Sequence, residues 1–254
     1  MFYPLLVLLF LIGLMMGSFI HCLASRYHQG YKFGGRSQCF SCNQKISWYD
    51  NIPLLSWLCL RGRCRHCRQP IAVSHFLAEL ASGILYALCF SYLWFSSGGW
   101  LELGLYLVVS SLWLLIFLSD YSWMEIYLPP LMIGAGIILV LQLLLGVSMI
   151  SLLLAMAIGA LFFGLQYLVT RGKGIGSGDI YLGALMGLIF ADWQLLLTAL
   201  FLSYIIGAIF SLFLLARNRR NLKAKVPLGV FLALGTLLAL FIGEPILSWY
   251  LTRH

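Results

Sequence analysis

Carboxylates are the scarcest chemically reactive side chains in this sequence. The 254 residues include eight Asp and Glu residues, against 16 Lys and Arg residues. Asp120 ends the apolar run 110–119, and Asp179 closes the glycine-rich segment 174–179 just before another apolar run. An ionisable group beside a membrane-like segment costs free energy and therefore marks a candidate functional site. Asp120 and Asp179 are accordingly the first candidates for catalysis.

Two carboxylates from separate helices could act together on a peptide bond. If they approach within hydrogen-bonding distance, they share one proton, because two neighbouring carboxylates cannot both ionise cheaply. The ionised member can then take a proton from water while the protonated member polarises the scissile carbonyl, as in an aspartyl protease. The same pair could instead bind ions or relay protons in a membrane carrier or channel. The residues alone leave both functions open.

The glycines before Asp179 suggest how this carboxylate is presented. Gly176 and Gly178 permit backbone angles and close approaches that other residues do not. We expect them to present Asp179 from a tight, partly unwound turn and to position the substrate. Glycine-rich turns also bind phosphate at helix N-termini, but a carboxylate at the end of this turn would repel phosphate. No strand-like segment precedes the turn, as a dinucleotide-binding motif requires.

Four of the seven cysteines form two Cys-x-x-Cys pairs within the hydrophilic segment 25–75. This is the spacing of the paired knuckles of a zinc ribbon. A segment of roughly 50 residues has little core of its own, so a bound metal would supply the missing stability. Two disulfides or a redox-active Cys-x-x-Cys pair are the alternatives, and a reducing cytoplasm argues against stable disulfides. The sequence therefore predicts one structural zinc ion, with the ligands Cys39, Cys42, Cys64 and Cys67.

Long apolar segments must position these groups. The chain is 62% hydrophobic and 9% charged, whereas a soluble domain is about 25% charged. The apolar blocks suit helices that cross a hydrocarbon core about 30 Å thick. We expect an all-α polytopic membrane protein with about eight transmembrane helices and a small cytoplasmic zinc-ribbon-like insertion. The expected spans are 1–24, 76–97, 102–118, 129–147, 149–170, the rather short 180–191, 193–216 and 227–250.

The spans and the insertion suggest a division into three parts. We expect a first transmembrane helix at 1–24, a cytoplasmic four-cysteine zinc-binding domain at 25–75, and a membrane-embedded aspartyl protease core at 76–254.

The basic residues predict the orientation. Lys and Arg concentrate in 26–68, 171–173 and 217–225, and the positive-inside rule places such loops in the cytoplasm. Both termini then lie outside, and Asp120 and Asp179 lie at cytoplasmic ends of spans. The net charge of +8 follows mostly from this topology, so we expect contact with membrane lipid and no nucleic-acid partner.

An ordered series of short motifs runs from Gly17 to about Gly235. The motifs are Gly17-Ser18-Phe19, Arg36-Ser37-x-Cys39-x-x-Cys42, the segment Trp-Tyr-Asp-Asn-Ile-Pro-Leu-Leu-Ser at 48–56, Arg61-Gly62-x-Cys64-x-x-Cys67, Ile71, Glu79, Asp120, Gly176-x-Gly178-Asp179 and Pro227-x-Gly229. This series resembles the type IV prepilin peptidases, bifunctional leader peptidase and N-methyltransferase enzymes of the Gly-x-Gly-Asp membrane aspartyl protease group.

The resemblance implies a protease of the bacterial cytoplasmic membrane. Such an enzyme removes a short basic leader from type IV prepilin-like precursors at the cytoplasmic face, and Asp120 and Asp179 match the catalytic pair. It also implies S-adenosylmethionine-dependent methylation of the new amino terminus. The matching residues for methyl transfer are Gly17, Ser18, Phe19, Arg61 and Glu79. No Rossmann-type methyltransferase motif occurs, so the second activity rests on the resemblance.

The chain departs from the family pattern in three places. His21 stands where Asn is common, Ser74-His75-Phe76 replaces an Arg-Tyr-Pro-like approach to Glu79, and Tyr-Leu-Pro-Pro at 127–130 lengthens the segment after Asp120. Glu79 could also be structural and pair with the arginines of 61–68. Two other functions compete with proteolysis: an ion- or proton-coupled transporter, and a zinc-ribbon scaffold that recruits a cytoplasmic partner.

Overall fold

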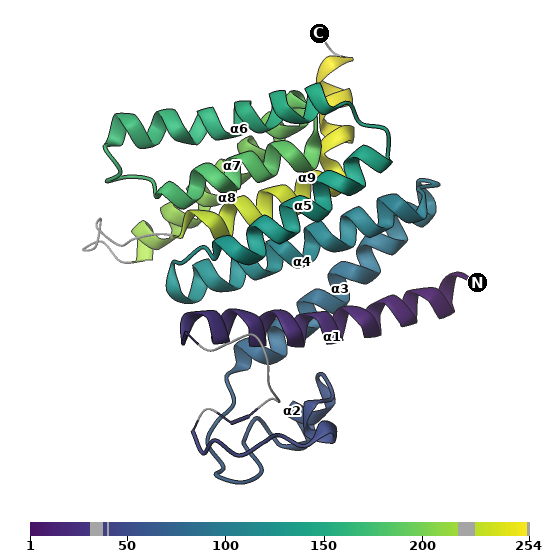
Figure 1. Ribbon diagram of the computed structural model, residues 1–254, viewed down its shortest axis with the longest axis vertical. Coiled ribbons are helices and arrows are strands. Elements are labelled where there is room, and N and C mark those ends of the chain that lie inside the picture. The colour runs from purple at the N-terminus through teal and green to yellow at the C-terminus, as the bar shows by residue number, and fades with distance from the viewer. Residues whose placement is uncertain (31–37, 40, 218–226, 253–254) are drawn as a thin grey trace. The chain divides into compact units, whose positions relative to one another are not determined.

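The computed structural model describes residues 1–30, 38–39, 41–217 and 227–252 (Figure 1). Arg36 and Ser37 of the first cysteine motif, and nearly all of the basic segment 217–225, lie outside this part of the chain. The described residues are almost entirely helical. The helices are α1 (Phe2–His28), the 3-10 helix η1 (Trp48–Asn51), α2 (Leu55–Cys59), α3 (Val73–Phe95), α4 (Trp100–Trp123), α5 (Leu128–Leu144), α6 (Met149–Thr170), α7 (Ser177–Phe190), α8 (Trp193–Arg217) and α9 (Leu228–Leu251).

The predicted helical membrane protein is confirmed. Each of the eight apolar segments contains a helix, and six helices of the described chain are long and apolar enough to cross a membrane: α1, α3, α4, α6, α8 and α9. The apolar helices α5 and α7 are shorter, with 17 and 14 residues. At about 1.5 Å per residue, α7 spans only about 21 Å, which agrees with the short segment expected there.

The chain forms two compact units, 1–98 and 99–254. The first unit contains α1, the cysteine-rich segment and α3, and its two long helices cross closely at small residues. A Cβ atom on Gly17 would lie 2.5 Å from the backbone oxygen of Ala78 and 2.7 Å from Cα of Glu79. Small residues commonly permit such approaches between membrane helices. Gly17 therefore has a packing role. The role in methyl transfer that the family resemblance implies for it stays a prediction.

The second unit contains α4 to α9 around an apolar core that includes Trp113, Phe163 and Met186. Its tightest contact joins α6 to α7, which run side by side in Figure 1. A Cβ atom on Gly159 would overlap the backbone oxygen of Gly183, and one on Gly183 would overlap Gly159 in return. This glycine contact fixes α7, the helix that carries Asp179, against α6.

Replacing Gly183 with Ala should therefore destabilise the second unit. We expect a loss of about 1–3 kcal/mol, because an added methyl group must push the two backbones apart. The melting temperature of the purified chain in detergent measures this effect. Gly164→Ala on α6 is the matched control, because its Cβ would meet nothing within 4 Å. Equal melting temperatures for the two variants would contradict the assigned helix contact.

Two helix boundaries differ from the expected ones and affect the carboxylates. Helix α4 continues to Trp123 and ends where Met124 adopts a left-handed conformation with φ of 55°, so Asp120 lies inside the last turns of the helix. Helix α7 begins at Ser177, so the expected partly unwound presentation of Asp179 is wrong. The physical reason is that the Asp179 carboxylate caps its own helix and thereby draws the end of the glycine-rich segment into the first turn.

Candidate active site and metal centre

Asp120 is a buried carboxylate near the end of α4, with 7% of its surface exposed. Its Oδ2 atom accepts a hydrogen bond of 3.1 Å from the backbone N–H of Val230, which lies in the first turn of α9. First-turn N–H groups have no acceptor within their own helix. The carboxylate from α4 therefore caps α9, and the partial positive charge at this helix end favours the ionised carboxylate.

The approach of Asp120 to α9 depends on Gly229. A Cβ atom at this position would lie 2.8 Å from Oδ2 and 3.1 Å from Cγ of Asp120, closer than unbonded atoms normally approach. The N-cap of α9 is Pro227, whose ring fixes the backbone just before the helix. The motif Pro227-x-Gly229 thus starts a helix and leaves room for a carboxylate at its end.

Asp179 is the third residue of α7 and is 8% exposed. Its Oδ2 atom accepts a hydrogen bond of 3.0 Å from the N–H of Gly176, which is the N-cap residue of α7. Gly178 packs against Ile126: a Cβ atom here would lie 2.7 Å from Cδ1 of Ile126. Gly176 thus holds Asp179 through its backbone, and Gly178 admits the segment that follows α4. The expected role of Gly176 and Gly178 in positioning the substrate stays a prediction.

The two carboxylates belong to one electrostatic site. Asp120 lies near enough to Asp179 for their charges to interact. The contact between Ile126 and Gly178 joins the loop after Asp120 to the turn before Asp179. Each carboxylate is buried and accepts a backbone N–H through Oδ2. This arrangement can hold two carboxyl groups rigidly in an apolar environment.

Sequence reasoning missed a polar pair beside this site. The Tyr204 hydroxyl on α8 donates a hydrogen bond of 3.1 Å to the side-chain oxygen of Gln166 on α6, and Tyr204 lies within the electrostatic influence of Asp179. Both residues lie within apolar segments, and neither belongs to a motif. Only the packing of α6 against α8 brings them together.

The four predicted zinc ligands form one cluster. Their Sγ atoms lie within 4.8 Å of one another. A tetrahedral zinc site with Zn–S distances of about 2.3 Å requires S···S distances of about 3.8 Å, and the Sγ atoms of Cys39 and Cys67 are 3.8 Å apart. The cluster therefore fits a metal ion such as zinc.

The backbone shapes the two halves of the cluster alike. Cys39 N–H donates to Gln44 O at 3.0 Å, and Cys64 N–H donates to Gln69 O at 2.9 Å. Each Cys-x-x-Cys pair is followed by a residue in the left-handed conformation, with φ of 56° at Asn43 and 59° at Arg68. These matching turns aim both thiols of each pair toward the same point.

A metal ligand must ionise, and two thiols of this cluster differ in how readily they do so. A hydrogen bond from the backbone N–H of Gln69 favours the thiolate of Cys67, but burial and hydrogen bonds with the neighbouring thiols outweigh it and raise the pKa of Cys67 to about 11. Burial opposes ionisation of Cys39, but hydrogen bonds from the backbone N–H groups of Cys42 and Ser41 and from neighbouring thiols outweigh it. Together they lower the pKa of Cys39 to about 7.

Changing a cluster cysteine to Ser should remove the metal. We expect the purified chain to hold about one zinc ion, and Cys64→Ser to lose most of it and loosen the segment around it. Elemental analysis and limited proteolysis measure these two effects. Cys59→Ser is the control, because Cys59 is exposed and lies outside the cluster. A folded, zinc-free chain with Cys39 bonded to Cys42 would contradict the prediction.

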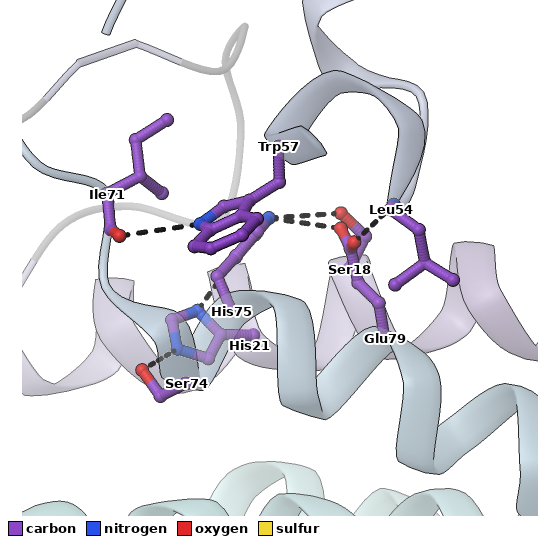
Figure 2. A network of polar contacts seen from close by, with 8 residues as sticks. All are labelled: Ser18, His21, Leu54, Trp57, Ile71, Ser74, His75 and Glu79. Carbon is purple, nitrogen blue, oxygen red and sulfur yellow. Dashed lines mark hydrogen bonds and ion pairs between the residues drawn. The ribbon is translucent and has the colours of Figure 1, made fainter. Parts of the chain in front are cut away.

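A second polar cluster joins α1, α3 and the loop before α2 (Figure 2). Glu79 is 3% exposed. Its Oε2 accepts a 2.7 Å hydrogen bond from Leu54 N–H, and its Oε1 lies 3.1 Å from Nε2 of His75. Nδ1 of His75 lies 3.0 Å from Nδ1 of His21. Within the described chain, the Glu79 carboxylate thus pairs with His75, whereas the alternative interpretation paired it with the arginines of 61–68.

Two family models match the chain. The bacterial Peptidase A24 N-terminal domain matches residues 11–93, and the Type IV leader peptidase family matches residues 107–212. The Prepilin leader peptidase/N-methyltransferase of Aeromonas hydrophila is 35% identical over 228 residues, which cover 86% of this chain and 75% of that relative. The chain belongs to the prepilin leader peptidase/N-methyltransferase family. The resemblance to the type IV prepilin peptidases is confirmed. The alternative of an ion- or proton-coupled transporter has no support.

Other members of the family agree with this assignment. The Prepilin leader peptidase/N-methyltransferase of Bacillus subtilis strain 168 is 30% identical over 97% of this chain and 98% of its own length. The one of Myxococcus xanthus strain DK1622 is 35% identical over 84% of this chain and 64% of its own length. No solved structure matches the chain.

The family matches divide the prepilin peptidase sites between the two units. The four-cysteine cluster and the Glu79 cluster fall in the N-terminal match, and Asp120 and Asp179 fall in the leader peptidase match. Gly229, which admits Asp120 to α9, lies beyond both matched segments. The motif Pro227-x-Gly229 pointed to this residue, and the contact with Asp120 shows what it does.

The other predicted methyl-transfer residues occupy different environments. Ser18 lies 3.5 Å from Nε2 of His75 and so joins the Glu79 cluster, whereas Phe19 is exposed. Arg61 lines a cavity of about 550 Å³ together with Arg63, Arg65 and Arg68 and with Cys59, Leu60 and Cys64.

One arginine of this cavity is already engaged. Arg65 donates hydrogen bonds of 2.8 and 2.6 Å to Asp50 and lies over the Tyr49 ring. These bonds from Arg65 lower the pKa of Asp50. The positive charges of the other three arginines therefore dominate the cavity.

Proposed function

We propose that this chain removes the short basic leader from type IV prepilin-like precursors and that Asp120 and Asp179 carry out the cleavage. The observation that supports this most strongly is the pair of buried carboxylates on contacting segments, each fixed by a backbone N–H at the start of a helix. Both lie in the unit that the leader peptidase family model matches. A rigid pair in an apolar environment is what activation of water between two carboxyl groups requires.

The chemistry follows from one shared proton. The ionised carboxylate takes a proton from a water molecule, whose oxygen attacks the carbonyl carbon of the scissile peptide bond. The protonated carboxyl group donates its proton to the carbonyl oxygen, which gives a neutral tetrahedral intermediate. When the C–N bond breaks, the leaving nitrogen receives a proton from the pair and becomes the new amino terminus. The backbone bonds to Oδ2 keep both carboxyl groups in place throughout.

The basic segments support a location in the bacterial cytoplasmic membrane with the cleavage site on the cytoplasmic side. Arg171 and Lys173 lie just before the turn that carries Asp179, and the cysteine-rich segment is also strongly basic. Such loops remain on the cytoplasmic side during insertion. The same side suits a precursor whose basic leader has not crossed the membrane, and anionic lipid would contact these loops.

We propose a second reaction, methylation of the new amino terminus, in the N-terminal unit. S-adenosylmethionine, when bound, supplies an electrophilic methyl group. Its carboxylate fits the cavity lined by Arg61, Arg63 and Arg68, because guanidinium groups bind carboxylates through charge-assisted hydrogen bonds. The volume of about 550 Å³ also falls within the usual range for small-molecule sites. These arginines would hold the cofactor, and zinc at the four-cysteine cluster would stabilise the segment that carries them.

Processing in cells tests the proposed cleavage. The chain should be expressed in a bacterium that has no prepilin peptidase, together with a precursor that carries a short basic leader before an apolar helix. We expect a shorter product that appears only when the chain is present. A precursor that keeps its full length, although the chain is inserted in the membrane, would overturn the proposal.

A further inference from the structure

The Glu79 cluster is a chain of polar contacts from Ser74 through His21 and His75 to Glu79 (Figure 2). When Glu79 is ionised, its carboxylate only accepts hydrogen bonds, and Nε2 of His75 then donates its proton to Glu79 across 3.1 Å. Nδ1 of neutral His75 is then an acceptor and takes a hydrogen bond from Nδ1–H of His21 at 3.0 Å. Nε2 of His21 in turn accepts from the hydroxyl of Ser74 at 3.1 Å. The chain of bonds therefore runs from Ser74 through both rings to Glu79.

The elements that carry this cluster are held together firmly. His21 lies on α1, and Ser74, His75 and Glu79 lie in the first turns of α3. The two helices approach closely through Gly17, and the Leu54 N–H joins the loop before α2 to Glu79. The two imidazole rings meet edge to face, with ring centres 4.8 Å apart. This packing holds the members of the cluster next to one another.

His21, His75 and Glu79 form a connected set of proton acceptors in the described part of the N-terminal unit, separate from the four-cysteine cluster. Residues 1–98 contain two carboxylates, Asp50 and Glu79, and four histidines. Asp50 is bound by Arg65, and His28 and His66 are exposed. His21 and His75 are both partly buried, and their rings are in contact.

We propose that His21 and His75 form a proton relay that deprotonates the amino terminus to be methylated, with Glu79 as the residue that positions and stabilises His75. This inference rests on the proposed methyl transfer. A free amino terminus has a pKa near 8 and is mostly an ammonium ion at about pH 7. Its nitrogen can attack a methyl carbon only after it loses a proton.

The ammonium group gives a proton to Nε2 of His21, and the hydrogen bond from the Ser74 hydroxyl to this nitrogen breaks. His21 then passes its Nδ1 proton to Nδ1 of His75. His75 becomes an imidazolium ion beside the Glu79 carboxylate, which stabilises the charge as the carboxylate of a catalytic triad does. The freed nitrogen lone pair forms the N–C bond, and the C–S electron pair returns to sulfur.

The first test compares methylation with cleavage in the purified full-length chain. His21→Asn and His75→Asn should lower the methylation rate by about 10²-fold at neutral pH, with cleavage of the precursor within about twofold of wild type. At a pH of about 9 the substrate amine is largely neutral in solution, so both variants should recover much of their methylation rate. A purely structural loss would not recover with pH. His28→Asn, on an exposed residue of α1, should leave both rates unchanged.

The second test observes the rings directly, without substrate or cofactor. Nitrogen NMR of the histidine side chains in detergent should show the Nε2–H tautomer for His75 and the Nδ1–H tautomer for His21. Glu79→Gln should remove this fixed assignment. The reverse tautomers, or variants that methylate at the wild-type rate, would overturn the relay alone. A wild-type chain that cleaves its precursor without methylating it would overturn the methyl-transfer function and the relay together.

Discussion

Replacing either Asp120 or Asp179 with Asn should lower the rate of leader removal by about 10³-fold or more. Each carboxyl group has a separate task, one as the base and the other as the acid, so neither can substitute for the other. Asn keeps the size and a hydrogen-bond acceptor, so the backbone bonds from Val230 and Gly176 can persist and the fold should be retained. Initial cleavage rates of the purified variants measure the effect.

Two other carboxylates provide matched controls. Glu102 accepts a hydrogen bond from Gly99 N–H at the start of α4, and Asp192 accepts one from Gln194 N–H at the start of α8. Glu102→Gln and Asp192→Asn should each weaken a helix cap by about 1 kcal/mol and leave cleavage nearly normal. Full processing by Asp120→Asn or Asp179→Asn would remove those residues from the proposed chemistry.

Gly229→Ala should produce the second largest effect, although Gly229 bears no functional group. The new Cβ atom would meet Oδ2 of Asp120 at 2.8 Å, so the carboxylate must leave the N–H of Val230. A displacement of about 1 Å in a catalytic group can cost about 10²-fold in rate. We expect a loss of this size in the cleavage rate, measured on protein that remains inserted and folded.

The control for this variant lies on the helix that carries Asp120. Gly104→Ala on α4 would place a Cβ atom where nothing lies within 4 Å, so cleavage should be unchanged. Thermal unfolding of both variants separates displacement of Asp120 from general destabilisation. If Gly229→Ala cleaves at the wild-type rate, α9 does not position Asp120 in the way proposed.

The sequence predicted the parts of this protein that have a compositional or spacing signal. The apolar blocks predicted the helices, and the paired cysteines predicted a cluster that forms. Asp120 and Asp179 were noticed because carboxylates are rare in this chain and because glycines precede one of them. Two helix boundaries were wrong, since Asp120 and Asp179 both lie within helical turns. The self-capping carboxylate of Asp179 explains the second error.

Other features depend on contacts that leave no pattern in a single sequence. The Val230 N–H that binds Asp120 is a backbone group, and every residue except proline has one. The bond between His21 and His75 joins positions 54 residues apart, and each histidine alone is indistinguishable from an interfacial imidazole. Only the crossing of α1 and α3 shows that they form one cluster with Glu79 (Figure 2).

The central claim is that one chain cleaves the precursor with its two carboxylates and then modifies the new end. The most direct measurement is mass spectrometry of a purified prepilin-like precursor after incubation in lipid with the purified wild-type chain and S-adenosylmethionine. We expect two products: the free basic leader, and a mature segment heavier by one methyl group. A precursor of unchanged mass, recovered from a reaction in which the chain is folded and holds its zinc, would show that the chain does neither.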